Sequence, residues 1–115
     1  MIRSGNLFSD VGAKGFGGEY FEDIFSASVG GELRLSRIVS RNVLSGEVYE
    51  QSEDEFVVVL AGRGEVCFSD SGERIAMECG DWLYIPAGVK HFVVETSVEP
   101  ACVWLAIFFS RDGDI

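Results

Sequence analysis

From Gly31 onward the chain alternates between short apolar segments and turn residues, and this alternation leaves few folds open. Asp70-Ser71-Gly72 is a hairpin turn signal, and Pro86-Ala87-Gly88 ends an extended segment. No segment of any length has the period of a helix, so an all-β sandwich or barrel is expected. The expected strands are 33–38, 42–49, 55–60, 65–69, 73–77, 81–85, 91–96 and 103–109.

The first third of the chain has a different composition from the rest. Seven of the 14 glycines lie within residues 1–31, and glycine weakens both helix and strand. We expect an irregular arm over residues 1–18, either a partly ordered terminus or a segment laid over the barrel or a partner subunit. Tyr20, Phe21, Ile24 and Phe25 then suggest a short docking segment. The predicted division is an arm and docking segment over 1–31 and a β-barrel domain over 32–115.

Length and charge restrict the classes of function. A chain of 115 residues is the size of one domain, and its formal net charge of −10 disfavours nucleic acid and membrane surfaces as partners. No apolar run reaches the roughly 18 residues of a membrane span, and the start lacks a signal-peptide pattern, so the cytoplasm is the expected location. The three cysteines lack zinc-site spacing and are expected to be buried free thiols.

One stretch carries a specific motif. Residues 80–91 read G-x5-P-x-G-x2-H, and Glu55 is followed by six residues and then Gly62. These spacings resemble the second motif and the end of the first motif of the cupin superfamily, over about residues 33–109. The resemblance implies a cupin-type double-stranded β-helix, a jelly-roll barrel. The predicted fold class is therefore all-β, with a glycine-rich arm before the barrel.

The first motif departs from the family pattern at its two histidine positions. One spacing places Tyr49 and Gln51 there, and the other places Val48 and Glu50. We favour the first, because Tyr49, Gln51 and Glu55 then share parity along an extended chain. His91 is the single histidine of the sequence, so two-histidine oxygen activation within one subunit is excluded.

Two interpretations of this site follow from the residues. In one, Gln51, Glu55 and His91 hold a divalent ion such as Zn, Ni, Fe or Mn, while Tyr49 and His91 act in catalysis. In the other, the four side chains satisfy one another by hydrogen bonds without an ion, with or without a small ligand. Arg37 and Arg41 either face the cavity, where they could clamp a carboxylate, or lie on the surface.

Three classes of function remain. The first is a metal-assisted isomerase, lyase or dioxygenase acting on a small organic acid or sugar, and the second is a metal-free module that binds a small molecule in the barrel. The third is an assembly or regulatory subunit without catalysis. The sequence leaves open whether the protein is an enzyme. The segment 103–109 is apolar on both faces, so it is either central in a sandwich or covered on one side by another subunit. Together with the family resemblance, this strand predicts a homodimer.

Overall fold

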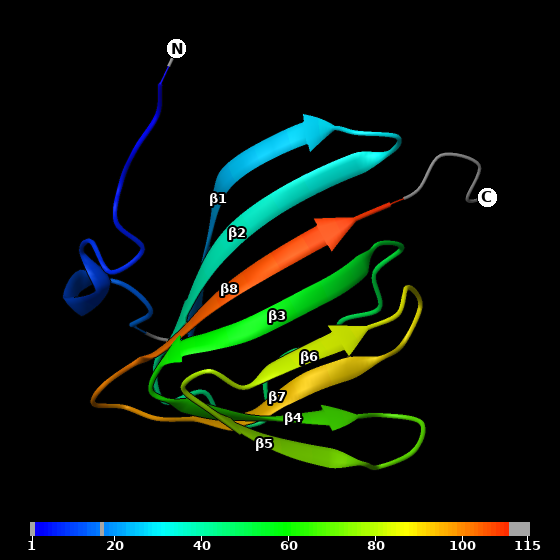
Figure 1. The fold of residues 1–115 in the computed structure, drawn as a ribbon. Helices are drawn as coiled ribbons and strands as arrows, with labels where there is room; N and C mark the ends of the chain where they lie inside the picture. Colours follow the sequence, from blue (N-terminus) through cyan, green and yellow to red (C-terminus); the bar gives the residue numbers. More distant parts are fainter. Residues whose placement is uncertain (1, 17, 111–115) are drawn as a thin grey trace.

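The computed structural model describes residues 2–16 and 18–110, which form two antiparallel β-sheets (Figure 1). The larger sheet has the strand order β1-β2-β8-β3-β6, and the smaller has the order β5-β4-β7. This arrangement confirms the prediction of an all-β jelly roll. The strands are β1 (Glu19–Ser28), β2 (Glu32–Ser40), β3 (Asp54–Ala61), β4 (Arg63–Phe68), β5 (Arg74–Glu78), β6 (Trp82–Ile85), β7 (His91–Thr96) and β8 (Cys102–Phe109).

The core lies between the two sheets and is built from alternate residues of their strands. Val57 and Val59 of β3 face inward with Trp104 of β8, and Val66 and Met77 meet them from the smaller sheet. Period-two alternation puts one apolar face of each strand into this space. Residues of this core also form part of the wall of a small cavity: Ile38, Val57, Val66 and Trp104.

A single residue connects the two sheets at Gly62, between β3 and β4. Its φ of +73° is in the left-handed region, and a Cβ there would lie 2.5 Å from the Ala101 carbonyl oxygen and 2.7 Å from Ser97 Oγ. Glycine tolerates both constraints because it has no side chain. The motif glycine is thus explained by the turn that brings the chain from one sheet to the other.

The segment with aromatic residues near position 21 is a strand and not a separate docking segment. β1 pairs with β2 along its whole length, and the register shifts between Asp23 and Phe25. Such an irregularity changes which face successive side chains occupy. The alternation of apolar and polar residues is therefore broken, which is why the sequence did not indicate a strand here.

The expected strand over 42–49 is also corrected. This segment makes only isolated bridges to β7, Leu44 with Glu95 and Tyr49 with His91. Asn42 and Ser45 have φ values of 54° and 50°, which interrupt an extended ladder. The segment is a loop, and this loop carries Tyr49 and Gln51 into the barrel.

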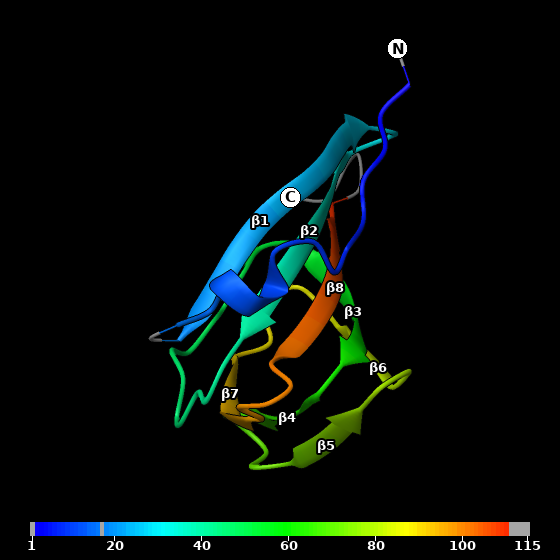
Figure 2. The ribbon, with the colours of Figure 1, turned by 90° about the vertical axis from the view of Figure 1, so that its left-hand side faces the viewer.

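The N-terminal arm is irregular as predicted, with one short 3-10 helix, η1 (Val11–Ala13). Figure 2 shows it on the outer side of the larger sheet. Arg37 Nη1 donates to the carbonyl oxygen of Ser9 at 2.6 Å, and Arg41 Nη2 donates to that of Val11 at 3.2 Å. Both arginines are buried, so the surface position predicted for them is wrong. Neither lines the barrel cavity, so they do not form the predicted clamp there.

Candidate functional site

Backbone hydrogen bonds bring the motif residues to one end of the barrel. Tyr49 and His91 exchange two such bonds, at 2.8 and 3.0 Å, and the Gly88 amide donates to the Gln51 carbonyl oxygen at 2.8 Å. Gly88 has a φ of +81°, so the sharp turn before β7 depends on glycine. Glu55 reaches the same place from the start of β3.

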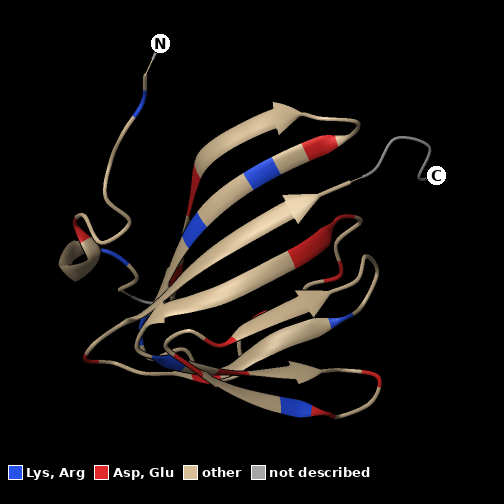
Figure 3. Cartoon of the chain, viewed as in Figure 1, with Lys and Arg blue, Asp and Glu red and all other residues tan. Residues whose placement is uncertain are grey.

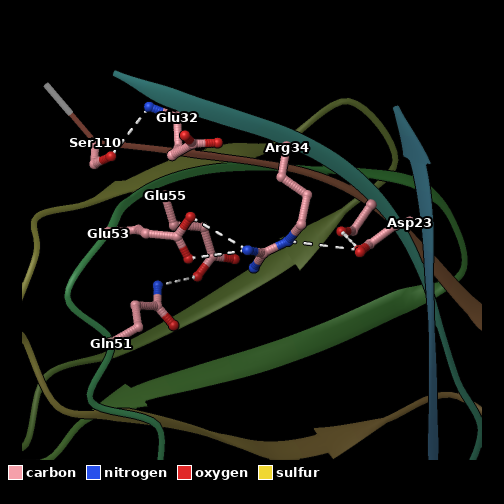
Figure 4. Close-up of polar contacts among 8 residues, drawn as sticks. Asp23, Glu32, Arg34, Gln51, Glu53, Glu55 and Ser110 are labelled. Carbon is pink, nitrogen blue, oxygen red and sulfur yellow. Dashed lines mark hydrogen bonds and ion pairs between the residues drawn. The ribbon is translucent and has the colours of Figure 1, made fainter. Parts of the chain in front are cut away.

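The side chains of Gln51, Glu55 and His91 form one polar cluster. Gln51 Nε2 donates to Glu55 Oε1 at 2.8 Å, a contact visible in Figure 4, and His91 Nε2 lies 3.6 Å from the same oxygen. His91 Nδ1 is 2.9 Å from the Val89 carbonyl oxygen. A carbonyl only accepts, so Nδ1 carries a proton and Nε2 faces the carboxylate.

The charge of Glu55 controls the protonation of His91. Both side chains are buried, at 6% exposure each. Burial opposes the charged imidazolium, but the Glu55 carboxylate and the Val89 carbonyl outweigh it and raise the pKa of His91 above its ordinary value. The Glu55 carboxylate therefore favours the imidazolium form of His91.

Tyr49 belongs to a second cluster, which includes a residue that the sequence analysis missed. Its hydroxyl donates to Glu19 Oε1 at 3.2 Å, and Ser40 Oγ donates to Glu19 Oε2 at 2.7 Å. Trp104 Nε1 donates to Ser40 Oγ at 3.0 Å. Glu19 was assigned to the docking segment, and only the pairing of β1 with β2, opposite Ser40, brings it to the site.

The surroundings of Tyr49 keep its phenol neutral. Burial, and then the negative charge of Glu19, raise the pKa of Tyr49 well above its ordinary value. Tyr49 can therefore donate a hydrogen bond to a carboxylate or to a ligand, but it does not supply a phenolate at neutral pH. The same two causes, burial and Glu19, raise the pKa of the neighbouring Cys102 thiol to about 12.

Both clusters face one cavity between the two sheets. Its volume is about 60 Å³, and its wall is otherwise apolar, with contributions from Phe21, Val93 and Trp104. Binding pockets of about 300–1,000 Å³ enclose a drug-sized molecule, so this cavity suits a much smaller compound or one end of a larger one. The polar residues of its wall are Glu19, Tyr49, Gln51, Glu55 and His91.

The structure agrees with the first of the two spacings, which we favoured because Tyr49, Gln51 and Glu55 share parity along an extended chain. Tyr49 and Gln51 line the cavity, whereas Val48 and Glu50 of the other spacing are exposed. The motif spacing therefore identified four of the five polar residues of the cavity wall, all except Glu19.

A further ion-pair cluster lies beside the Gln51–Glu55 contact. Figure 4 shows Arg34 between Glu53 and Asp23, with guanidinium–carboxylate distances of 3.1 and 3.5 Å to the two acids. The Arg34 guanidinium also stacks over the Phe108 ring, 4.4 Å from its centroid. These acids compensate the charge of Arg34, which is not among the residues that line the cavity.

The donor set fits a metal ion poorly. Among the described residues, no group of three or more His, Cys, Asp or Glu side chains is arranged to hold one. The cavity offers one imidazole and one nearby carboxylate, the Gln51 amide nitrogen already faces that carboxylate, and Tyr49 is a neutral phenol. Zinc and its neighbours prefer three or four nitrogen, sulfur or carboxylate ligands.

Two antiparallel sheets packed around a small cavity define a jelly-roll barrel. The sequence model of the cupin domain family matches residues 42–108. This match covers more than half of the chain, which therefore belongs to the cupin family. Within residues 2–16 and 18–110, no helix has the length and apolar character needed to cross a membrane.

Individual relatives agree with the family assignment. An uncharacterized protein of Aquifex aeolicus (strain VF5) is 41% identical over 66 residues, 56% of this chain and 51% of that protein, so the chain spans about half the length of this relative. A solved structure from Ralstonia eutropha JMP134, provisionally named a mannose-6-phosphate isomerase, is 31% identical with a TM-score of 0.81 and covers 96% of this chain and 100% of its own.

A more distant structure supports the fold alone. The cupin domain of Schizosaccharomyces pombe Cnp3 is 12% identical, with a TM-score of 0.68 over 81% of this chain and 61% of its own.

Proposed function

We propose that this protein binds a small organic molecule in the barrel cavity without the help of a metal ion. The observation that carries the proposal is the Gln51–Glu55–His91 cluster, whose members contact one another while they face an otherwise apolar cavity. Pockets for small molecules are typically apolar with a few placed polar groups. A barrel without a ligand would lower its free energy by filling this space with apolar side chains.

The competing proposal is metal-assisted isomerase, lyase or dioxygenase chemistry. In that case Gln51, Glu55 and His91 would hold the ion, and His91 and Tyr49 would act in catalysis. The ligand set argues against it, since one imidazole and one carboxylate bind late transition metals weakly. The name of the Ralstonia protein suggests a sugar phosphate, but among the described residues no Arg or Lys lines the cavity to receive a phosphate.

The two proposals differ in what the purified protein contains. We expect elemental analysis of the tag-free chain to find far less than one equivalent of any transition metal, with no change in His91→Ala. One equivalent that disappears in His91→Ala would overturn the metal-free proposal and support the metal-assisted one.

A bound organic molecule is the second readout. Native mass spectrometry of the protein from its expression host is expected to show a small adduct that is lost in Val93→Phe, where the added ring enters the cavity. Val94→Phe is the matched control, because Val94 is the next residue of β7 and is not part of the cavity wall. An adduct that survives Val93→Phe would place the ligand elsewhere.

We further propose that the protein is a homodimer whose subunits meet through the outer face of the larger sheet. Phe56, Leu105 and Ile107 are half-buried on that face, and β8 carries no charged residue (Figure 3). A second copy would remove this apolar surface from water.

The three free cysteines, two of them buried, support a reducing compartment such as the cytoplasm.

A further inference from the structure

The unusual group in the cavity is Glu19, because its partners are neutral. Its carboxylate accepts hydrogen bonds from the hydroxyl groups of Ser40 and Tyr49. Ser40 is completely buried and is itself held by Trp104. The carboxylate is therefore fixed in position and half withdrawn from water, with two hydrogen bonds and no opposite charge from these partners.

No cation of the described chain compensates Glu19. The cavity wall contains neither Lys nor Arg, and its one imidazole, that of His91, pairs with Glu55. Arg41 lies in the adjoining groove, but its guanidinium is 2.7 Å from Glu99. Glu19 is half-buried and has no ion-pair partner among the described residues, so a ligand that brings positive charge would gain an attractive interaction there.

Aromatic rings surround the same position. Phe21 and Tyr49 both line the cavity beside Glu19, with ring centroids 6.1 Å apart and an interplanar angle of 69°. Aromatic faces attract cations within about 6 Å, and the attraction grows when water is excluded. A carboxylate with aromatic neighbours is the combination that selects an ammonium group over a neutral or anionic one.

The shape of the site limits the size of the ligand. Glu19 and Tyr49 line both the cavity of about 60 Å³ and an open groove of about 750 Å³. We propose that the ligand is a small primary amine whose ammonium group binds Glu19 at this junction, with its short apolar part in the cavity. This inference rests on the proposed small-molecule function and names the class of ligand.

The test uses three probes of similar shape and different charge: butylammonium, butan-1-ol and butyrate. Dissociation constants are measured by NMR titration of the full chain. We expect butylammonium to bind about tenfold more tightly than butan-1-ol, and butyrate to bind most weakly of the three. In Glu19→Gln, the affinity for the amine should fall about tenfold, to that of the alcohol, while the affinity for the alcohol stays unchanged.

Two further variants separate the charge of Glu19 from other effects. Glu73→Gln makes the same change of charge at an exposed residue that lines neither the cavity nor the groove, and should leave amine binding intact. Tyr49→Phe removes one hydrogen-bond donor but keeps the carboxylate, so the preference for the amine should persist. This variant keeps the inference testable if Glu19→Gln fails to fold.

Each outcome decides between the two proposals. Equal binding of amine and alcohol, or tighter binding of butyrate, overturns the amine inference and leaves the small-molecule function standing. An amine preference that persists in Glu19→Gln overturns the role of Glu19, and its loss in Tyr49→Phe would assign the preference to the phenol hydroxyl instead. If none of the three probes perturbs the cavity residues, both the inference and the proposed function are contradicted.

Discussion

Glu55 is the residue on which the charge of His91 depends. We expect Glu55→Gln to lower the pKa of His91, because the carboxylate is the main group that favours the imidazolium. The His91 pKa is read from its ring proton shifts by NMR. Glu53→Gln is the control, since Glu53 pairs with Arg34. An unchanged His91 pKa in Glu55→Gln would contradict the ion pair.

The same pair gives a pH-dependent contribution to stability. Folding raises the pKa of His91, so this stabilisation is fully present below the unfolded value of about 6.5 and is lost as the pH rises through the folded value. The free energy of unfolding should therefore differ more between wild type and Glu55→Gln near about pH 6 than near about pH 9. Urea unfolding at both pH values measures the difference, and equal differences would refute the linkage.

Gly64 is a packing constraint that sequence alone does not show. A Cβ at this position would lie 2.6 Å from Trp104 Cζ2 and 2.8 Å from Cη2. Trp104 is buried and cannot move freely, so Gly64→Ala should lower the free energy of unfolding by about 1–3 kcal/mol. Gly5→Ala, where a Cβ meets nothing within 4 Å, should have little effect in the same urea experiment.

Residue spacing was enough to predict most of the site. Glu55, Gly62, Gly88 and His91 follow from motifs whose geometry is local, since each glycine marks a turn that only a glycine readily adopts. Glu19 could not be found in this way. Its place depends on the pairing of β1 with β2 and on which face β1 presents after an irregular register, and both are set by contacts between distant parts of the chain.

At the scale of elements, Arg37 joins the arm, β1 and β2. Its guanidinium donates to the carbonyl oxygens of Leu7 and Ser9 and pairs with Glu22 at 2.9 Å. We expect Arg37→Leu to lower the free energy of unfolding by about 1–3 kcal/mol, because charged hydrogen bonds are lost while the buried, unpaired Nε is also removed.

The arm should respond more strongly than the barrel. Hydrogen exchange in Arg37→Leu should accelerate at arm amides that are themselves hydrogen-bonded, such as those of Ser9 and Ala13, and remain slow in β3 and β8. Arg63→Leu serves as the control, since Arg63 is exposed and its ion pair with Glu95 spans 3.7 Å. Unchanged exchange in the arm would show that Arg37 does not hold it.

Apolar strands bounded by turn residues were predicted well, and elements with an irregular backbone were not. The strands from residue 54 to 109 lie within a few residues of their expected bounds. The expected strand at 42–49 proved to be a loop, since left-handed residues at Asn42 and Ser45 leave no sign in apolar patterning. Such conformations depend on tertiary contacts as much as on the residue type.

At the scale of the whole molecule, the proposed dimer depends on the outer face of the larger sheet. Light scattering is expected to report a dimer for wild type and a monomer for Ile107→Glu, because a charge placed on this apolar face opposes its burial. Val94→Glu adds the same charge to the smaller sheet and should remain dimeric. A wild-type monomer would refute the dimer, and a dimeric Ile107→Glu would place the interface elsewhere.

The hairpin of β1 and β2 precedes the cupin match at residue 42, yet β1 supplies Glu19 and Phe21 to the cavity wall. β1 is an edge strand, and its one strand neighbour in the sheet is β2. Its inward side chains can therefore change while the turns at Gly62 and Gly88 that close the barrel stay the same. Protein engineers could therefore redirect the barrel to new compounds by grafting a different β1–β2 hairpin, with the rest of the fold unchanged.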